Sequence, residues 1–395
     1  MVEPIMEAPV VVEPAPMMAE PLPGSRTAGP RPRRGVVTAG DIEDGLNLAA
    51  FLRYQKRATA ETGLPRADLG GAFAAQLVDA SGKPAPGIRV TLSKPGAAEP
   101  FYDGYSGTDG RVLVYPALHG AGHPKAVQLR AFGEGQTVTV QRFGRAGGPA
   151  QQVVLPAPVD GYAPDFLDLA FVIDTTGSMG DEIAWLTREF AGLVRQARQA
   201  APGANIRFGL VAYRDQGDDY VVRNFGFTQN QRQMQGWLAG LDANGGGDYP
   251  EAADRAMEAA AGLTWRRGKG ERLLFHIADA PAHKAGAKRY LAASRKLALA
   301  QVQVFGLGAS GTGPEAEFLM RQAAAQSNGR YLFLTDDSGV GLAHGEPSVA
   351  CYKVTRLKSL LSRVLVSELT GHRREAPGSQ VIREVGSYRD GVCRQ

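Results

Sequence analysis

Cysteine is scarce in this sequence of 395 residues: only Cys351 and Cys393 are present, both near the C-terminus. Neither lies in a CxxC pair, so the sequence gives no sign of a zinc site or a dithiol redox centre. The two cysteines would form a disulfide in an oxidising compartment and would remain thiols in a reducing cytosol. The sequence leaves both states open.

Long apolar runs and concentrated charge are missing as well. No stretch approaches the ~18 apolar residues that a membrane-spanning helix requires. Glutamates and prolines interrupt the first residues, so no signal peptide is expected in the chain as it stands. The formal net charge of +4 is spread thinly along the sequence, which argues against a nucleic-acid-binding protein.

The composition is typical of a globular protein, with 44% hydrophobic and 21% charged residues. The length allows two domains with tails. Residues 1–37 are rich in proline and poor in aromatic side chains, so we expect a disordered tail there. Residues 38–65 have apolar side chains at helical spacing from Leu46 to Tyr54, and we expect a short helical linker.

Residues 66–157 consist of short segments with alternating apolar and polar side chains, separated by turns rich in Gly, Pro and Asp. Six or seven short strands in this span predict a small all-β sandwich. The segments 78–84, 87–90 and 108–111 resemble the transthyretin-like, carboxypeptidase-regulatory-like sandwiches. That resemblance implies an accessory module. The residues of this span show no catalytic grouping, since His119 and His123 lie in a glycine-rich loop.

Residues 165–371 alternate buried strands with amphipathic helices. The run 167–173 is largely apolar, as expected for a strand inside a parallel sheet, and a helical pattern follows it. The alternation recurs and predicts a doubly wound, Rossmann-like α/β fold, with a mostly parallel sheet and one antiparallel edge strand. We expect the last helix over 352–369 and a C-terminal tail over 372–395.

Oxygen-bearing side chains follow three elements of this predicted fold. In chain order they are Asp174, Thr176, Ser178, Asp248 and Asp279. Because ligands bind at the carboxyl ends of the strands in such sheets, these side chains should converge. Hard divalent cations take carboxylate and hydroxyl oxygens as ligands. Helix capping would explain the first loop alone equally well, but it does not explain two further aspartates in matching loops.

Residues 171–179, with the sequence FVIDTTGSM, resemble the metal-ion-dependent adhesion site (MIDAS) of von Willebrand factor A (VWA) domains. The resemblance implies that Asp174, Thr176 and Ser178 bind Mg²⁺, or Mn²⁺ or Ca²⁺ in its place, with Asp279 acting directly or through water. Asp248 stands where the family usually has threonine, which lowers the residual charge of the metal. The resemblance further implies a binding module rather than an enzyme, with a partner protein that supplies an acidic side chain to the metal.

Two alternatives remain open. A Mg²⁺-dependent phosphoryl-transfer hydrolase also uses an aspartate at the end of its first strand, but it needs a second aspartate where Thr176 stands. A metal that only rigidifies a scaffold in an envelope assembly is the other alternative. The accessory sandwich favours an extracytoplasmic location, in the periplasm or at the cell surface.

Overall fold

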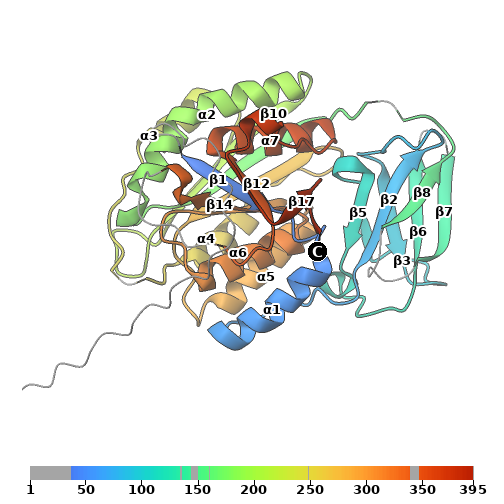
Figure 1. Cartoon of the computed structure of the whole chain (residues 1–395), viewed down its shortest axis with the longest axis horizontal. Coiled ribbons are helices and arrows are strands. Elements are labelled where there is room, and N and C mark those ends of the chain that lie inside the picture. Colours follow the sequence, from blue (N-terminus) through green and yellow to red (C-terminus); the bar gives the residue numbers. More distant parts are fainter. Residues whose placement is uncertain are drawn as a thin grey trace, which may run out of the picture.

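The structure is a computed structural model that describes residues 37–133, 136–143, 150–159, 161–247, 249–338 and 347–394. The predicted N-terminal tail therefore lies outside the described residues, except for Val37. Figure 1 shows two units beside each other: a large sheet covered by helices, and a smaller β unit. Within the described ranges, no helix is both long and apolar enough to cross a membrane.

The large sheet has nine strands among the described residues, and its centre is parallel. Five neighbouring strands run in the same direction, namely β10 (Asn205–Tyr213), β9 (Phe166–Asp174), β12 (Glu271–Ala278), β13 (Gln303–Gly308) and β14 (Tyr331–Thr335). At one edge β11 (Val222–Thr228) pairs antiparallel with β10. The predicted doubly wound α/β fold is confirmed.

Helices cover both faces of this sheet (Figure 1). One face carries α2 (Gly180–Ala200), α3 (Gln231–Ala239) and α7 (Leu357–Thr370). The other face carries α1 (Leu48–Thr62), α4 (Ala253–Ala261), α5 (Ala287–Leu299) and α6 (Pro314–Gln326). Alternate residues of β9 enter the two cores, so that Phe171 packs on the first set of helices and Val172 on the second. This is why the strand is apolar except for Asp168, which pairs with Arg207 and Arg266, and its last residue, Asp174.

The segment predicted as a helical linker, residues 38–65, begins instead with a strand of the large sheet. β1 (Thr38–Ile42) lies between β14 and β15 (Tyr352–Arg356) and is antiparallel to both. All five of its residues are buried. Gly40 allows the close approach, because a Cβ there would lie 2.7 Å from the Phe333 ring. The linker prediction was therefore wrong for this strand, and only α1 agrees with it.

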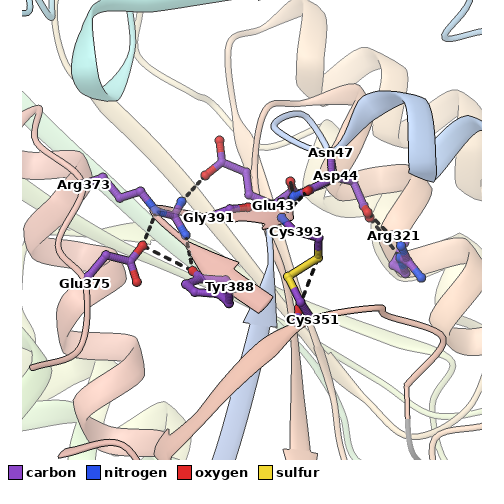
Figure 2. The surroundings of a disulfide bond; sticks show 10 residues. All are labelled: Glu43, Asp44, Asn47, Arg321, Cys351, Arg373, Glu375, Tyr388, Gly391 and Cys393. Carbon is purple, nitrogen blue, oxygen red and sulfur yellow. Dashed lines mark hydrogen bonds and ion pairs between the residues drawn. A yellow bond between two sulfur atoms is a disulfide. The ribbon is translucent and has the colours of Figure 1, made fainter. Parts of the chain in front are cut away.

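The predicted C-terminal tail, residues 372–395, was also wrong, because this segment forms strands against the large domain. Its three short strands are β16 (Arg383–Val385), which pairs with β15, and the hairpin of β17 (Ser387–Arg389) and β18 (Val392–Arg394). Cys393 forms a disulfide with Cys351, and its backbone N–H donates to the Asn47 side chain at 2.8 Å (Figure 2). The helix predicted over 352–369 begins only at Leu357, because residues 352–356 form β15, which pairs with β1.

The smaller unit has two sheets that share one apolar core. One sheet contains β5 (Arg111–Val114), β2 (Phe73–Asp79) and β8 (Gln151–Leu155), and the other contains β4 (Tyr102–Tyr105), β3 (Arg89–Ser93), β6 (Val127–Gly133) and β7 (Gln136–Phe143). Leu77, Leu92 and Leu129 meet in the core between them. The unit contacts the edge of the large sheet where the parallel strands begin, and there the Asn328 side chain donates to the carbonyl of Leu113 at 3.0 Å.

Candidate metal centre

Asp174 is the last residue of β9 and is fully buried at the carboxyl edge of the large sheet. The backbone N–H and the hydroxyl of Thr176 donate to its Oδ1 at 2.9 and 2.8 Å. Its Oδ2 makes no hydrogen bond of normal geometry among the described residues. Burial raises the pKa of Asp174 to about 7, although the bonds from Thr176 act in the opposite direction. The carboxylate therefore has one oxygen that is desolvated and unused.

Asp279 directly follows β12, the strand that pairs with β9. The hydroxyl of Ser178, in the short turn that opens α2, donates to the Asp279 carboxylate. Burial raises the pKa of Asp279, and the bond from Ser178 opposes this shift. The structure thus brings together four of the five predicted residues, with Asp174 and Thr176 in the same loop as Ser178.

The fifth predicted residue, Asp248, lies outside the described residues. The glycine loop before it is described and packs closely on the first loop. Gly246 has a φ of 74°, and a Cβ there would lie 2.9 Å from Oε1 of Glu251 and 3.1 Å from Cβ of Thr176. Both the positive φ and the lack of space require glycine at this position.

Glu251 lies beside these residues, and the sequence analysis did not identify it. Its side chain is 4% exposed, and its Oε2 has no hydrogen-bond partner in the described part of the chain. Burial raises its pKa to about 9, with further contributions from the carboxylates of Asp174, Asp215, Asp218 and Asp279. The only feature of the sequence that pointed to Glu251 was its position shortly after the glycine loop. Because residues 250–263 have a helical pattern, Glu251 was assigned to that helix and not to the site.

Cationic side chains at this edge bind the surrounding loops rather than these carboxylates. Arg214 is 2% exposed and donates to the carbonyl of Thr175 at 3.3 Å and to the Asp242 carboxylate at 2.9 Å. His283 Nε2 lies 2.7 Å from Oδ1 of Asp215. The loops are thereby fixed, while these cationic side chains leave the central carboxyl groups uncompensated.

The arrangement fits a cation with mixed ligands. In the ranges that the structure describes, no three His, Cys, Asp or Glu side chains form a metal-binding group on their own. A cation at this edge would therefore also need hydroxyl ligands, which Thr176 and Ser178 offer. The unpartnered oxygens of Asp174 and Glu251 are what an absent positive charge would leave behind, because buried charges are ordinarily paired or bound to metal.

The fold and this edge define a doubly wound α/β domain with oxygen ligands at the carboxyl ends of its strands. Residues 168–343 match the family model described as von Willebrand factor A domain, so the chain contains a VWA domain. The match begins within β9 and does not extend over the smaller β unit. The transthyretin-like resemblance of that unit therefore stays a prediction.

Curated relatives are similar over short regions only. The alpha-protein kinase vwkA of Dictyostelium discoideum is 30% identical over 125 residues, which are 31% of this chain and 19% of the kinase. The von Willebrand factor A domain-containing protein 7 of Homo sapiens is 36% identical over 92 residues, 23% of this chain and 10% of that protein. The aligned region thus spans less than a fifth of either relative.

One solved structure with a weak likeness to this chain is that of a bacterial protein. The BatB protein from Bacteroides thetaiotaomicron has a TM-score of 0.33 and 16% sequence identity to this chain. The likeness covers 42% of this chain and 89% of BatB.

Proposed function

We propose that the carboxyl edge of the large sheet binds one divalent cation, Mg²⁺ in the first place, with Mn²⁺ or Ca²⁺ as substitutes. Asp174, Thr176, Ser178 and Asp279 would hold the cation, and Glu251 would face it from the adjacent loop. The observation that supports this most directly is the buried Oδ2 of Asp174 without a hydrogen-bond partner among the described residues. An ionised carboxylate in that state is costly, and a bound cation offsets the cost.

We also propose that the cation serves protein binding and not catalysis. A cation that its ligands neutralise only in part attracts an acidic side chain from a partner protein. The VWA domain supports this proposal through the adhesion-site motif around Asp174. The disulfide between Cys351 and Cys393 fits an oxidising compartment, so we propose an extracytoplasmic location.

The number of carboxylates favours a second candidate function. Asp174, Glu251 and Asp279 together exceed the charge of one divalent cation when all three are ionised, and this reduces the attraction for an acidic partner. Asp248, if it is also a ligand, would reduce it further. The cation would then rigidify the loops of a scaffold and would leave partner binding to other surfaces.

Metal binding is tested by thermal melting in EDTA and in excess Mg²⁺, Mn²⁺ or Ca²⁺. At about 100 times the dissociation constant, a cation stabilises the folded state by about 2.7 kcal/mol. For a domain of this size we expect Tm to rise by about 5–10 °C. Asp174→Ala should abolish the rise, whereas Asp181→Asn, an exposed carboxylate in the first turn of α2, should preserve it. Equal rises in wild type and Asp174→Ala would refute the site.

Partner binding is tested on arrays of peptides that each carry a single Asp or Glu, with the full chain as the probe. The binding proposal predicts capture in Mg²⁺ that is lost in EDTA and in Asp174→Ala. Metal binding without metal-dependent capture would favour the scaffold. A panel of phosphate esters tested with Mg²⁺ covers the enzyme alternative, and turnover that disappears in Asp174→Asn would overturn the proposal that the cation is not catalytic.

A further inference from the structure

A chain of buried polar side chains lies behind the candidate metal centre. The Tyr213 hydroxyl lies 3.2 Å from Nε2 of His276, and Nδ1 of the same ring lies 3.0 Å from the Tyr290 hydroxyl. The three residues come from β10, β12 and α5, and each is at most 1% exposed. They are surrounded by the apolar core between the sheet and α4, α5 and α6. Polar groups are costly in such a core unless every one of them is hydrogen-bonded.

This row of buried polar side chains ends at Asp174. Tyr213 and Asp174 are direct partners in the register of β10 and β9, so their side chains leave the sheet on the same face. His276 is the register partner of Val172, two residues before Asp174, and therefore shares that face. The Tyr213 hydroxyl lies close enough to the Asp174 carboxylate to lower its pKa, although no hydrogen bond of normal geometry joins them. One face of the sheet thus links α5 to the carboxyl edge.

The chemistry of the groups gives the chain a single direction. An ionised carboxylate only accepts hydrogen bonds, so with the cation bound the Tyr213 O–H would point to Asp174. The Tyr213 oxygen then accepts from His276, which requires the proton on Nε2. Nδ1 of the neutral ring is left as an acceptor for the Tyr290 O–H. Burial lowers the pKa of His276 to about 3, which keeps the ring neutral as this pattern requires.

We propose that Tyr290, His276 and Tyr213 form a positioning chain that fixes the orientation of the Asp174 carboxylate for the cation, an inference that rests on the proposed metal site. Metal ligands are commonly held by such outer hydrogen bonds, and their loss typically weakens metal binding about 10- to 100-fold. None of the three side chains needs to contact the metal. This positioning chain couples the packing of α5 to the affinity of the carboxyl edge for the cation.

The test is a calorimetric titration of Mn²⁺ into the full chain and its variants, with Tm measured in EDTA. Tyr213→Phe should weaken Mn²⁺ binding about tenfold or more, and Tyr290→Phe should weaken it less because it removes only the far donor. Tyr115→Phe is the matched control, since its hydroxyl is buried where the smaller unit meets the large domain and has no hydrogen-bond partner among the described residues. That control should leave the Mn²⁺ affinity unchanged.

A second readout separates positioning from simple packing. ¹⁵N NMR of the wild type should show His276 neutral with its proton on Nε2, and both ring signals should shift when Mg²⁺ is added. If wild type binds Mn²⁺ and both tyrosine variants bind it equally well, the positioning chain is refuted while the metal site stands. A proton on Nδ1 would refute it even if Tyr213→Phe fails to fold. If wild type binds no metal at all, it is the proposed function that fails.

Discussion

Near the edge where the parallel strands begin, a group of buried carboxylates is paired with arginines, whereas at the carboxyl edge Asp174, Glu251 and Asp279 have no arginine partner among the described residues. We call the first group the junction cluster; it consists of Asp41, Glu43, Asp44, Glu368, Arg111, Arg321, Arg330 and Arg373. Burial pushes the pKa of Glu43 up, but Arg111, Arg373 and Arg330 outweigh it and lower the pKa to about 2. At the other edge the pKa of Glu251 is raised to about 9.

The two groups differ in whether basic side chains of the protein compensate the buried carboxylates. The junction cluster joins the smaller unit to the large domain, since Arg111 comes from β5 and Thr108 donates to Glu368 at 2.6 Å. Its charges compensate one another within the chain. Asp174, Glu251 and Asp279 at the carboxyl edge are buried to a comparable degree but lack such compensation, and we propose that a bound ion supplies it.

The largest expected effect is the removal of an arginine from the junction cluster. Arg321 donates to both oxygens of Asp44 at 2.9 and 2.7 Å, and both side chains are buried. Arg321→Ala leaves that charge unpaired and should lower the free energy of unfolding by about 3–5 kcal/mol, measured in urea. Arg57→Ala, which breaks the exposed pair with Glu61, should change it by less than about 0.5 kcal/mol. Equal effects would mean that burial does not distinguish these pairs.

The disulfide fixes the C-terminal hairpin at the same edge (Figure 2). Its cysteines are 42 residues apart, and the bond limits the conformational entropy of the unfolded chain. Cys393→Ser removes this restriction and should lower the free energy of unfolding by about 4 kcal/mol. Because the site is at the opposite edge, Mn²⁺ affinity should remain. Urea unfolding with and without reductant checks this, and Cys393→Ser should be indifferent to reductant. A reductant that leaves the wild-type curve unchanged would contradict the expectation.

The pKa of Glu43 predicts how the junction cluster responds to acid. The folded-state pKa of about 2 lies below the ordinary value of 4.5, so the contribution is complete above pH 4.5 and is lost as the pH falls to about 2. The shift corresponds to about 3 kcal/mol. Urea unfolding of wild type and Glu43→Gln should therefore differ most above pH 4.5 and converge towards pH 2. A constant difference would argue that Glu43 is not charged in the folded state.

The smallest expected effect has the opposite sign and lies at the carboxyl edge. In EDTA at neutral pH, wild-type Glu251 must take up a proton on folding, because burial and the neighbouring carboxylates raise its pKa to about 9. Glu251→Gln removes this cost and should raise the free energy of unfolding by on the order of 1–3 kcal/mol. Excess Mg²⁺ should then stabilise the wild type more than the variant. Thermal melts in both buffers check this. A variant that is less stable than wild type in EDTA would show that the edge is complete without metal.

The residues at the carboxyl edge of the large sheet were predicted better from the sequence than β1 and the C-terminal strands. Asp174 and Asp279 were identified because each follows a strand with a clear apolar pattern, and such strands fix where their last residues lie. Glu251 was missed because a glutamate near a helix start reads as an ordinary helical residue. β1 was missed because it has five residues, two of them polar, and its burial depends on partners that follow it by about 300 residues.

The C-terminal strands were missed for a related reason. They have three residues each and are too short for a periodic pattern. Their place is fixed by long-range contacts, namely the disulfide and the bonds from Asn47 to Gly391 and Cys393. No local pattern in the sequence encodes such contacts.

The most direct test of the account is the stoichiometry of Mn²⁺ binding, measured by calorimetry on the full chain at neutral pH. We predict one Mn²⁺ per chain for wild type and for Arg57→Ala, and none for Asp174→Ala. The same stoichiometry and affinity in Asp174→Ala would contradict the account, since the carboxyl edge would then not be the place where the missing charge is supplied.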